Sequence, residues 1–286
     1  MKTRVITAVV GLFVLAGVLF TFNTLVFNLV IAAITLLALH EIYMALGFEK
    51  RDWPLLGVLV PYTLLIMLSS YQVCRRRVMP ASFLVVLFYA IYRVVRNGTI
   101  SYQKASGLAM FSGIVIFCFY SFIRLKELLP VEKFGYDAIF FILLILCFAW
   151  GGDTCAYFAG RAFGKHKLCP VVSPKKTVEG AVGGVLGTMV FGVLVTVIYS
   201  VAADRMEAFT RSNIGVSMYI IIALLACVAA VLGIYGDLFA SVVKRQCGIK
   251  DYGTIFPGHG GILDRFDSVM FIAPFVTMVV IAVFYH

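Results

Sequence analysis

Charged residues are scarce in this sequence. They make up 13% of its 286 residues, whereas 62% are hydrophobic and the mean hydropathy is +1.01. A soluble domain carries about 25% charged residues, so an ordinary soluble fold is excluded and lipid must cover much of the surface. We expect an all-α fold, a polytopic transmembrane helical bundle of about nine helices.

Histidine is also scarce, with four residues, and the seven cysteines form no CxxC pair. His166 and His286 have no partner at ligand spacing, which excludes a zinc site. We expect neither a disulfide framework nor a thiolate metal site, because most of the cysteines lie in apolar runs, where cysteine behaves as a small hydrophobe. The glycine-rich stretch 183–187 lacks the Gly-Lys-Ser/Thr of a P-loop and indicates close helix packing instead.

Apolar runs predict the membrane spans, since about 20 apolar residues cross a bilayer as a helix. The first run follows Lys2 and Arg4 and is interpreted as a retained helix rather than a cleaved signal peptide. The predicted spans are residues 5–22, 25–46, 55–71, 81–95, 107–123, 138–158, 181–202, 216–240 and 269–285.

The net charge of +10 would suggest nucleic acid in a soluble protein, but here we expect none. Lys and Arg gather in cytoplasmic loops and near anionic headgroups. With the N-terminus inside, inner loops carry 16 of the 24 basic residues and outer loops carry 8. This split favours a cytosolic N-terminus, although the run 75–77 of three arginines on the outer side argues against it.

The two halves of the chain differ in polarity. Residues 1–135 are predicted to be scaffold helices, with lipid or dimer contacts, and His40 and Glu41 are their main polar exception. Residues 136–286 have longer polar loops and acids at membrane depth, so they are predicted to form the catalytic region with cytosolic loops.

Two polar segments open this second half. Asp153 lies in an apolar run, where an acid is either functional or paired, here with Arg161 or a lysine at a helix end. Downstream, Pro174 fits a turn just before a helix whose free amides Ser or Thr could satisfy. Lysines beside that helix start favour an anion site, although a positive-inside loop without a ligand is the alternative. The candidate binding residues of this segment are Ser173, Lys175, Lys176, Thr177 and Glu179.

A polar stripe follows near the end of the eighth span. Asp237, Ser241 and either Lys244 or Arg245 recur at helical spacing and share one face. Snorkelling of a Lys-Arg pair at a helix end explains the two cations but not the acid.

The next loop combines glycine with acids. Gly258, Gly260 and Gly261 surround His259, and such a backbone can approach a ligand and offer amides to phosphate. Asp264 and Asp267, at i and i+3, are expected to share a face as the last helix begins. Together with Asp237 they could hold magnesium, which prefers carboxylates plus substrate phosphates. An acidic helix cap balanced by Arg265 is the alternative, with His259 a loop hydrogen-bonder.

These residues resemble the signature of the phosphatidate cytidylyltransferase family, also called CDP-diacylglycerol synthases. The match spans 27 residues, 241–267, and reads Ser241-x-x-Lys244-Arg245-x4-Lys250-Asp251-x-Gly253-x-x-Phe256-Pro257-Gly258-His259-Gly260-Gly261-x-x-Asp264-Arg265-x-Asp267. The Gly-Gly-Asp and Ser-Pro-Lys-Lys-Thr-x-Glu-Gly segments upstream are similar to the family as well. The resemblance implies CTP and phosphatidic acid as substrates, magnesium as cofactor, an active site facing the cytosol and a homodimer.

The residue patterns and the resemblance together give each candidate residue an expected role. Magnesium, with a second Mg²⁺ or K⁺ as an option, is expected on Asp237, Asp264 and Asp267, and Lys244 and Arg245 complete the catalytic set. The substrate-binding candidates are Asp153, Ser173, Lys175, Lys176, Thr177, Glu179, Ser241, Lys250, Asp251, Gly258, His259, Gly260, Gly261 and Arg265.

Two other functions stay open. One is a related membrane enzyme, such as a polyprenol kinase, that uses CTP on another lipid. The other is a cation-coupled transporter, although no internal repeat is found. The Asp-Gly-x-x-Ala-Arg motif of CDP-alcohol phosphotransferases is missing. We expect an integral protein of a bacterial inner membrane.

Overall fold

The computed structural model describes residues 2–96, 100–205, 215–256, 258 and 260–284. These form two compact units. The first comprises Met1–Ile123 and Gln246–Arg265, and the second comprises Arg124–Arg245 and Phe266–His286. The loop that carries the glycines therefore packs with the N-terminal helices. The predicted functional division at residue 135 is a different one and stays a prediction.

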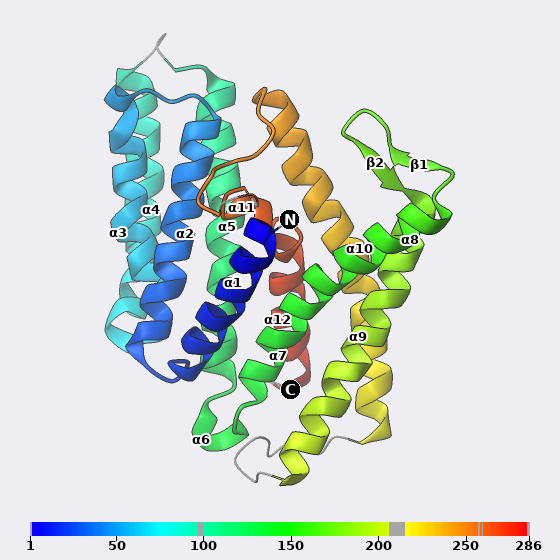
Figure 1. Ribbon diagram of the computed structural model, residues 1–286. Coiled ribbons are helices and arrows are strands. Elements are labelled where there is room, and N and C mark those ends of the chain that lie inside the picture. The colour runs from blue at the N-terminus through cyan, green and yellow to red at the C-terminus, as the bar shows by residue number, and fades with distance from the viewer. Residues whose placement is uncertain (1, 97–99, 206–214, 257, 259, 285–286) are drawn as a thin grey trace. The chain divides into compact units, whose positions relative to one another are not determined.

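Helices dominate the first unit, in which α2, α3, α4 and α5 run alongside one another (Figure 1). Thr24 caps α2 by accepting a hydrogen bond from Val26 N at 3.2 Å. The elements are α1 (Lys2–Phe20), α2 (Leu25–Ala45), the 3-10 turn η1 (Lys50–Asp52), α3 (Trp53–Met67), α4 (Gln72–Val95) and α5 (Tyr102–Leu128), which continues into the second unit.

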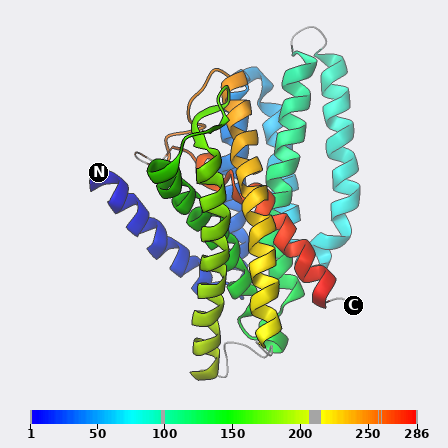
Figure 2. The same cartoon turned by 90° about the vertical axis from the view of Figure 1, so that its right-hand side faces the viewer.

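Long helices also form the second unit, where α9 and α10 lie side by side (Figure 2). Its elements are α6 (Val131–Phe134), α7 (Asp137–Leu146), the π-helical segment η2 (Cys147–Gly151), α8 (Gly152–Phe163), β1 (Lys167–Cys169), β2 (Ser173–Thr177), α9 (Val178–Arg205), α10 (Val216–Gln246) and α12 (Val269–Phe284), with the short α11 (Leu263–Phe266) at the junction of the units.

Small residues let α8 and α9 approach closely, as the glycine-rich stretch predicted. A Cβ at Gly183 would overlap the Cβ of Ala159, and one at Gly187 would overlap Cys155. A Cβ at Gly152 would meet the Thr188 hydroxyl at 2.5 Å. Because α8 carries Asp153 in its first turn, this packing fixes where that carboxylate lies.

The membrane character of the chain is confirmed, but the count of nine spans is not. Six helical segments among the described residues are long and apolar enough to cross a bilayer: Leu25–Ala45, Gln72–Val95, Tyr102–Leu128, Asp137–Phe163, Val178–Ala202 and Val216–Gln246. Shorter apolar helices occupy Val9–Phe20 and Val269–Val283. The run of arginines expected in an outer loop instead lies in the first turns of α4, since arginine is a good helix former.

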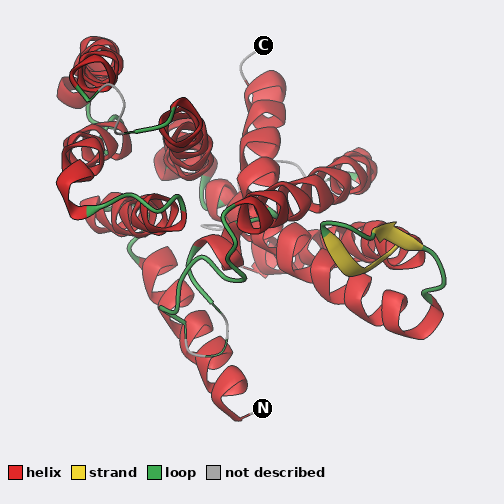
Figure 3. Cartoon of the chain, turned by 90° about the horizontal axis from the view of Figure 1, so that it is seen from above, coloured by secondary structure: helices red, strands yellow, loops and turns green. Residues whose placement is uncertain are grey.

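The expected turn at Pro174 is also wrong. Residues 173–177 form β2, which pairs antiparallel with β1 in a small hairpin, shown as the yellow strands in Figure 3. The helix begins at Val178, directly after the strand. The hydroxyl of Thr177 accepts a hydrogen bond from Gly180 N at 3.1 Å, so the predicted capping by a hydroxyl is confirmed.

Candidate active site

The polar stripe on α10 forms as its spacing predicted. The Ser241 hydroxyl donates to Asp237 Oδ1 at 3.3 Å, one helical turn away. The second carboxylate oxygen of Asp237 makes an ion pair with Lys176 of β2. Both side chains are about one-quarter exposed, at 23% and 25%, so a solvated ligand can reach them. Lys244 and Arg245 lie in the last turn of the same helix.

The hairpin that carries Lys176 is attached to the start of α9 by Glu179. The Glu179 carboxylate accepts hydrogen bonds from Lys165 N at 3.0 Å and from His166 N at 3.2 Å. It also bonds to His166 Nδ1 at 2.7 Å. Glu179 therefore orients the hairpin in this structure, and its predicted contact with substrate stays a prediction. Sequence reasoning missed this use of His166, because its partner lies 13 residues away on a different element.

Two further acids belong to the same unit as Asp237. Asp153 is in the first turn of α8, directly after the π-helical segment, a feature that is frequent at functional sites. Ser268 bridges it to Asp267: the Ser268 hydroxyl donates to Asp153 Oδ2 at 3.2 Å, and Ser268 N donates to Asp267 Oδ1 at 2.9 Å. The described contact of Asp153 is with Ser268, and the alternative of a pairing with Arg161 or a lysine stays open.

The charges of Asp153 and Asp237 affect the pKa of Asp267. Burial, followed by the negative charges of Asp237 and Asp153, raises the pKa of Asp267 well above its ordinary value, while Lys244 acts in the opposite direction. Carboxylates of α8, α10 and the turn before α12 thus repel one another. A divalent cation would offset that repulsion, and hard carboxylate oxygens suit magnesium.

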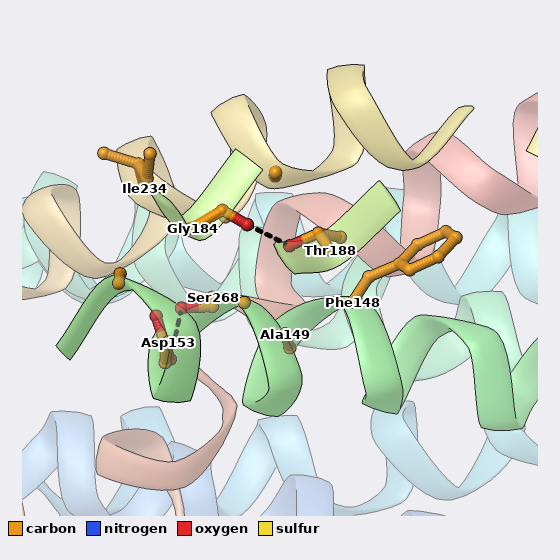
Figure 4. A pocket seen from close by; sticks show the side chains of 11 residues that line it. Phe148, Ala149, Asp153, Gly184, Thr188, Ile234 and Ser268 are labelled. Carbon is orange, nitrogen blue, oxygen red and sulfur yellow. Dashed lines mark hydrogen bonds between the residues drawn. The ribbon is translucent and has the colours of Figure 1, made fainter. Parts of the chain in front are cut away.

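A small cavity of about 20 Å³ lies beside this cluster (Figure 4). Asp153 and Ser268 line one part of it, and Thr188 and Phe148 line another. The Thr188 hydroxyl is directed back to Gly184 O, to which it donates at 2.8 Å. The volume suits about one water molecule, so the cavity can hydrate the Asp153 carboxylate but is far too small for a nucleotide.

The glycine loop and Asp264 belong to the first unit. Gly258 and Gly260 have φ of +77° and +86°, the left-handed region that favours glycine. Phe256 N donates to Gly260 O at 2.9 Å and closes the loop. Asp264, at 7% exposure, accepts from Tyr252 N at 2.8 Å and Gly261 N at 2.9 Å through the same oxygen.

Asp264 thus organises the loop, and its predicted role as a metal ligand stays a prediction. The expectation that Asp264 and Asp267 share a face at the start of the last helix is wrong. Asp264 lies in α11 and Asp267 in the turn before α12, because the helix is interrupted after Phe266. Pro257 and His259 lie outside the described residues.

The acids of the predicted metal set are divided between the two units, and their joint role stays a prediction. Asp237 and Asp267 belong to one unit, together with Asp153, and Asp264 belongs to the other. Across the described ranges, no three His, Cys, Asp or Glu side chains form a group that could hold a metal ion.

The remaining predicted binding residues lie on the hairpin and on the loop. Ser173 and Lys175 are on β2 with Lys176, and Arg265 is on α11. Lys175, Lys250, Asp251 and Arg265 are exposed. Their predicted contacts with substrate stay predictions.

Long apolar helices that carry acids such as Asp153 and Asp237 define an integral membrane protein with polar groups within its helical bundle. A family model described as the cytidylyltransferase family matches residues 2–283. The chain belongs to this family and is a membrane-embedded cytidylyltransferase.

Curated relatives that carry a name match this chain over nearly its full length. The chain is 32% identical over 283 residues to the phosphatidate cytidylyltransferase of Bacillus subtilis (strain 168), covering 96% of each chain. It is 31% identical over 287 residues to the phosphatidate cytidylyltransferase of Staphylococcus epidermidis (strain ATCC 12228 / FDA PCI 1200), covering 98% of this chain and 99% of the relative. The protein of the same name from Staphylococcus haemolyticus (strain JCSC1435) is 29% identical over 288 residues.

Proposed function

We propose that this protein is a phosphatidate cytidylyltransferase, which converts CTP and phosphatidic acid into CDP-diacylglycerol and pyrophosphate. The observation that carries the proposal is the contact of Lys176 with Asp237 in the unit that also holds Asp153 and Asp267. This contact places a cation beside acids carried by apolar helices, an arrangement that suits a lipid phosphate and a nucleotide. The names of the relatives support this choice of substrates.

The reaction needs no covalent enzyme intermediate. A phosphate oxygen of phosphatidic acid attacks the α-phosphorus of CTP, a new P–O bond forms, and the bond to the leaving pyrophosphate breaks. Charge spreads over the phosphoryl oxygens, so catalysis consists of positioning and electrostatic stabilisation. Lys175 and Lys176 from the hairpin, Lys244 and Arg245 from α10, and Arg265 supply the positive charge.

A magnesium ion would offset the negative charge of Asp237, which together with burial raises the pKa of Asp267. These two residues would hold the metal, and Asp153 belongs to the same unit. The metal-ligand role predicted for Asp264 is tested by its substitution with asparagine. The bound metal supplies positive charge against the triphosphate. A second Mg²⁺ or K⁺ beside the first is part of the same proposal.

The glycine loop binds phosphate oxygens in this scheme. Gly258 and Gly260 present backbone amides without side chains in the way, and Lys250 and Asp251 of the same unit are exposed. The contacts of Ser241, His259 and Gly261 with substrate are part of the same proposal. Because CTP is cytosolic, the site faces the cytosol of a bacterial inner membrane. The active protein is a homodimer, which cross-linking in native membranes tests.

The test uses purified protein in mixed micelles with phosphatidic acid, magnesium and each of the four nucleoside triphosphates. We expect a lipid-linked nucleotide and an equal amount of pyrophosphate from CTP alone. A CTP-dependent lipid kinase would release CDP and phosphorylate a lipid alcohol, and a cation-coupled transporter would turn over no CTP. Either result contradicts the proposal.

A variant pair links the activity to the site. Lys176→Met removes the cation beside Asp237 and should lower turnover about tenfold or more, since one charge-assisted hydrogen bond from a lysine to a substrate phosphate contributes roughly 1.5–3 kcal/mol. Lys133→Met is the matched control, because Lys133 lies on α6 with its ammonium 5.0 Å from the centre of the Phe134 ring. The control should retain parental turnover.

A further inference from the structure

Glu41 is a buried acid in the N-terminal half, with 4% of its surface exposed. It lies on α2, and both carboxylate oxygens accept hydrogen bonds from the start of α11. Oε1 accepts from Ile262 N at 2.8 Å, and Oε2 accepts from Leu263 N at 2.9 Å. These partners are 221 and 222 residues away in the sequence but belong to the same compact unit.

The loop is shaped to receive this carboxylate. A Cβ at Gly253 or at Gly261 would collide with the Glu41 carboxylate where it now lies, so glycine at both positions leaves room for it. An unpaired carboxylate would be costly to bury, and the two backbone amides are what offset that cost here. The fit is therefore specific to an acid that reaches two neighbouring amides.

Two carboxylates thus hold the loop. Asp264 binds Tyr252 N and Gly261 N from within the loop, and Glu41 binds the next two amides, those of Ile262 and Leu263. A glycine-rich loop loses much conformational entropy when it is ordered, so it needs such anchors to keep one conformation. Glu41 is the anchor that comes from outside the loop.

We infer that Glu41 is a positioning residue for nucleoside triphosphate binding. It touches no reacting atom but holds the end of the glycine loop, whose Gly258 and Gly260 amides are proposed to bind the triphosphate. This inference rests on the proposed function. It gives the N-terminal helices, which carry few polar groups, a direct part in nucleotide binding.

The test compares Glu41→Gln with Asn28→Leu in purified full-length protein. Glutamine keeps one acceptor oxygen but turns an NH2 group towards the second amide, so one of the two bonds is lost. Asn28 is a matched control because it is buried on the same helix, where its amide donates to Met67 O at 2.6 Å and Ser70 Oγ at 2.9 Å. It lies about 20 Å along α2 from Glu41.

We expect Glu41→Gln to lower kcat/KM for CTP about ten- to hundredfold and to raise KM for CTP at least about threefold. Backbone amide exchange in a peptide containing Ile262 and Leu263 should be faster than in the parent. Asn28→Leu should lower thermal stability while KM for CTP and exchange in that peptide stay unchanged.

Parental kinetics in Glu41→Gln would overturn the inference. So would a fall in kcat with unchanged KM and unchanged exchange, because that pattern means a loss of folded protein only. If Glu41→Gln does not fold, Glu41→Asp is measured by the same criteria, since aspartate keeps the charge but is too short to reach both amides. If the parent makes no CDP-diacylglycerol from CTP, the proposed function fails, and the exchange measurement still decides whether Glu41 anchors the loop.

Discussion

Replacing Asp237 by asparagine separates a structural from a catalytic role for the α10 stripe. The structural cost should be small. The ion pair with Lys176 joins side chains that are 25% and 23% exposed, and such pairs contribute about 0–1 kcal/mol. Asparagine keeps an oxygen that can accept from the Ser241 hydroxyl, so little more is lost. We therefore expect thermal stability to fall by at most about 1 kcal/mol.

The catalytic cost should be much larger. If Asp237 holds a metal or balances the cations around the triphosphate, removal of its charge should lower turnover about 100- to 1000-fold, or roughly 3–4 kcal/mol. Turnover is measured at saturating CTP, phosphatidic acid and magnesium, on protein that elutes like the parent in mild detergent.

Asp137→Asn is the matched control for this experiment. Asp137 is an acid of the same unit, 3% exposed, and it accepts a hydrogen bond from the Tyr199 hydroxyl at 2.8 Å. Asparagine can keep that acceptor, so turnover should stay within about threefold of the parent, a difference under 1 kcal/mol. If Asp237→Asn also stays within about threefold, the assignment of Asp237 to the catalytic site is wrong.

Three more predictions concern the metal, the loop and the topology. CDP-diacylglycerol formation should stop in excess EDTA and return with added magnesium; full activity in EDTA would exclude the metal role. Asp264→Asn should lose about 100-fold or more in turnover if Asp264 binds metal, because asparagine can still accept from Tyr252 N and Gly261 N, whereas activity within about threefold would leave Asp264 a loop organiser only. Single cysteines placed in residues 161–176 and 244–267 of a cysteine-free chain should react from the same side, in inverted vesicles rather than intact cells, and opposite sidedness would refute the topology.

The sequence by itself determined the membrane class and much of the local chemistry. Apolar runs identify helices because a span must satisfy its backbone within itself. The stripe of Asp237 and Ser241 follows from helical spacing, and close packing at the 183–187 glycines follows from their size. The 27-residue match at 241–267 indicated the family, which the comparisons confirm.

Only the tertiary structure decided how these segments meet. A helix that is apolar on every side does not indicate which face it buries, so the pairing of Asp153 with Ser268, 115 residues away, could not be predicted. The same holds for Lys176 with Asp237, because it depends on a hairpin in a segment whose Pro and Lys residues do not favour strands. Glu41 was noticed as a polar exception, but its partners 221 and 222 residues away become neighbours only when α2 and the glycine loop fold into one unit. Local patterns fix helices and caps, whereas contacts between distant segments depend on packing that no local pattern encodes.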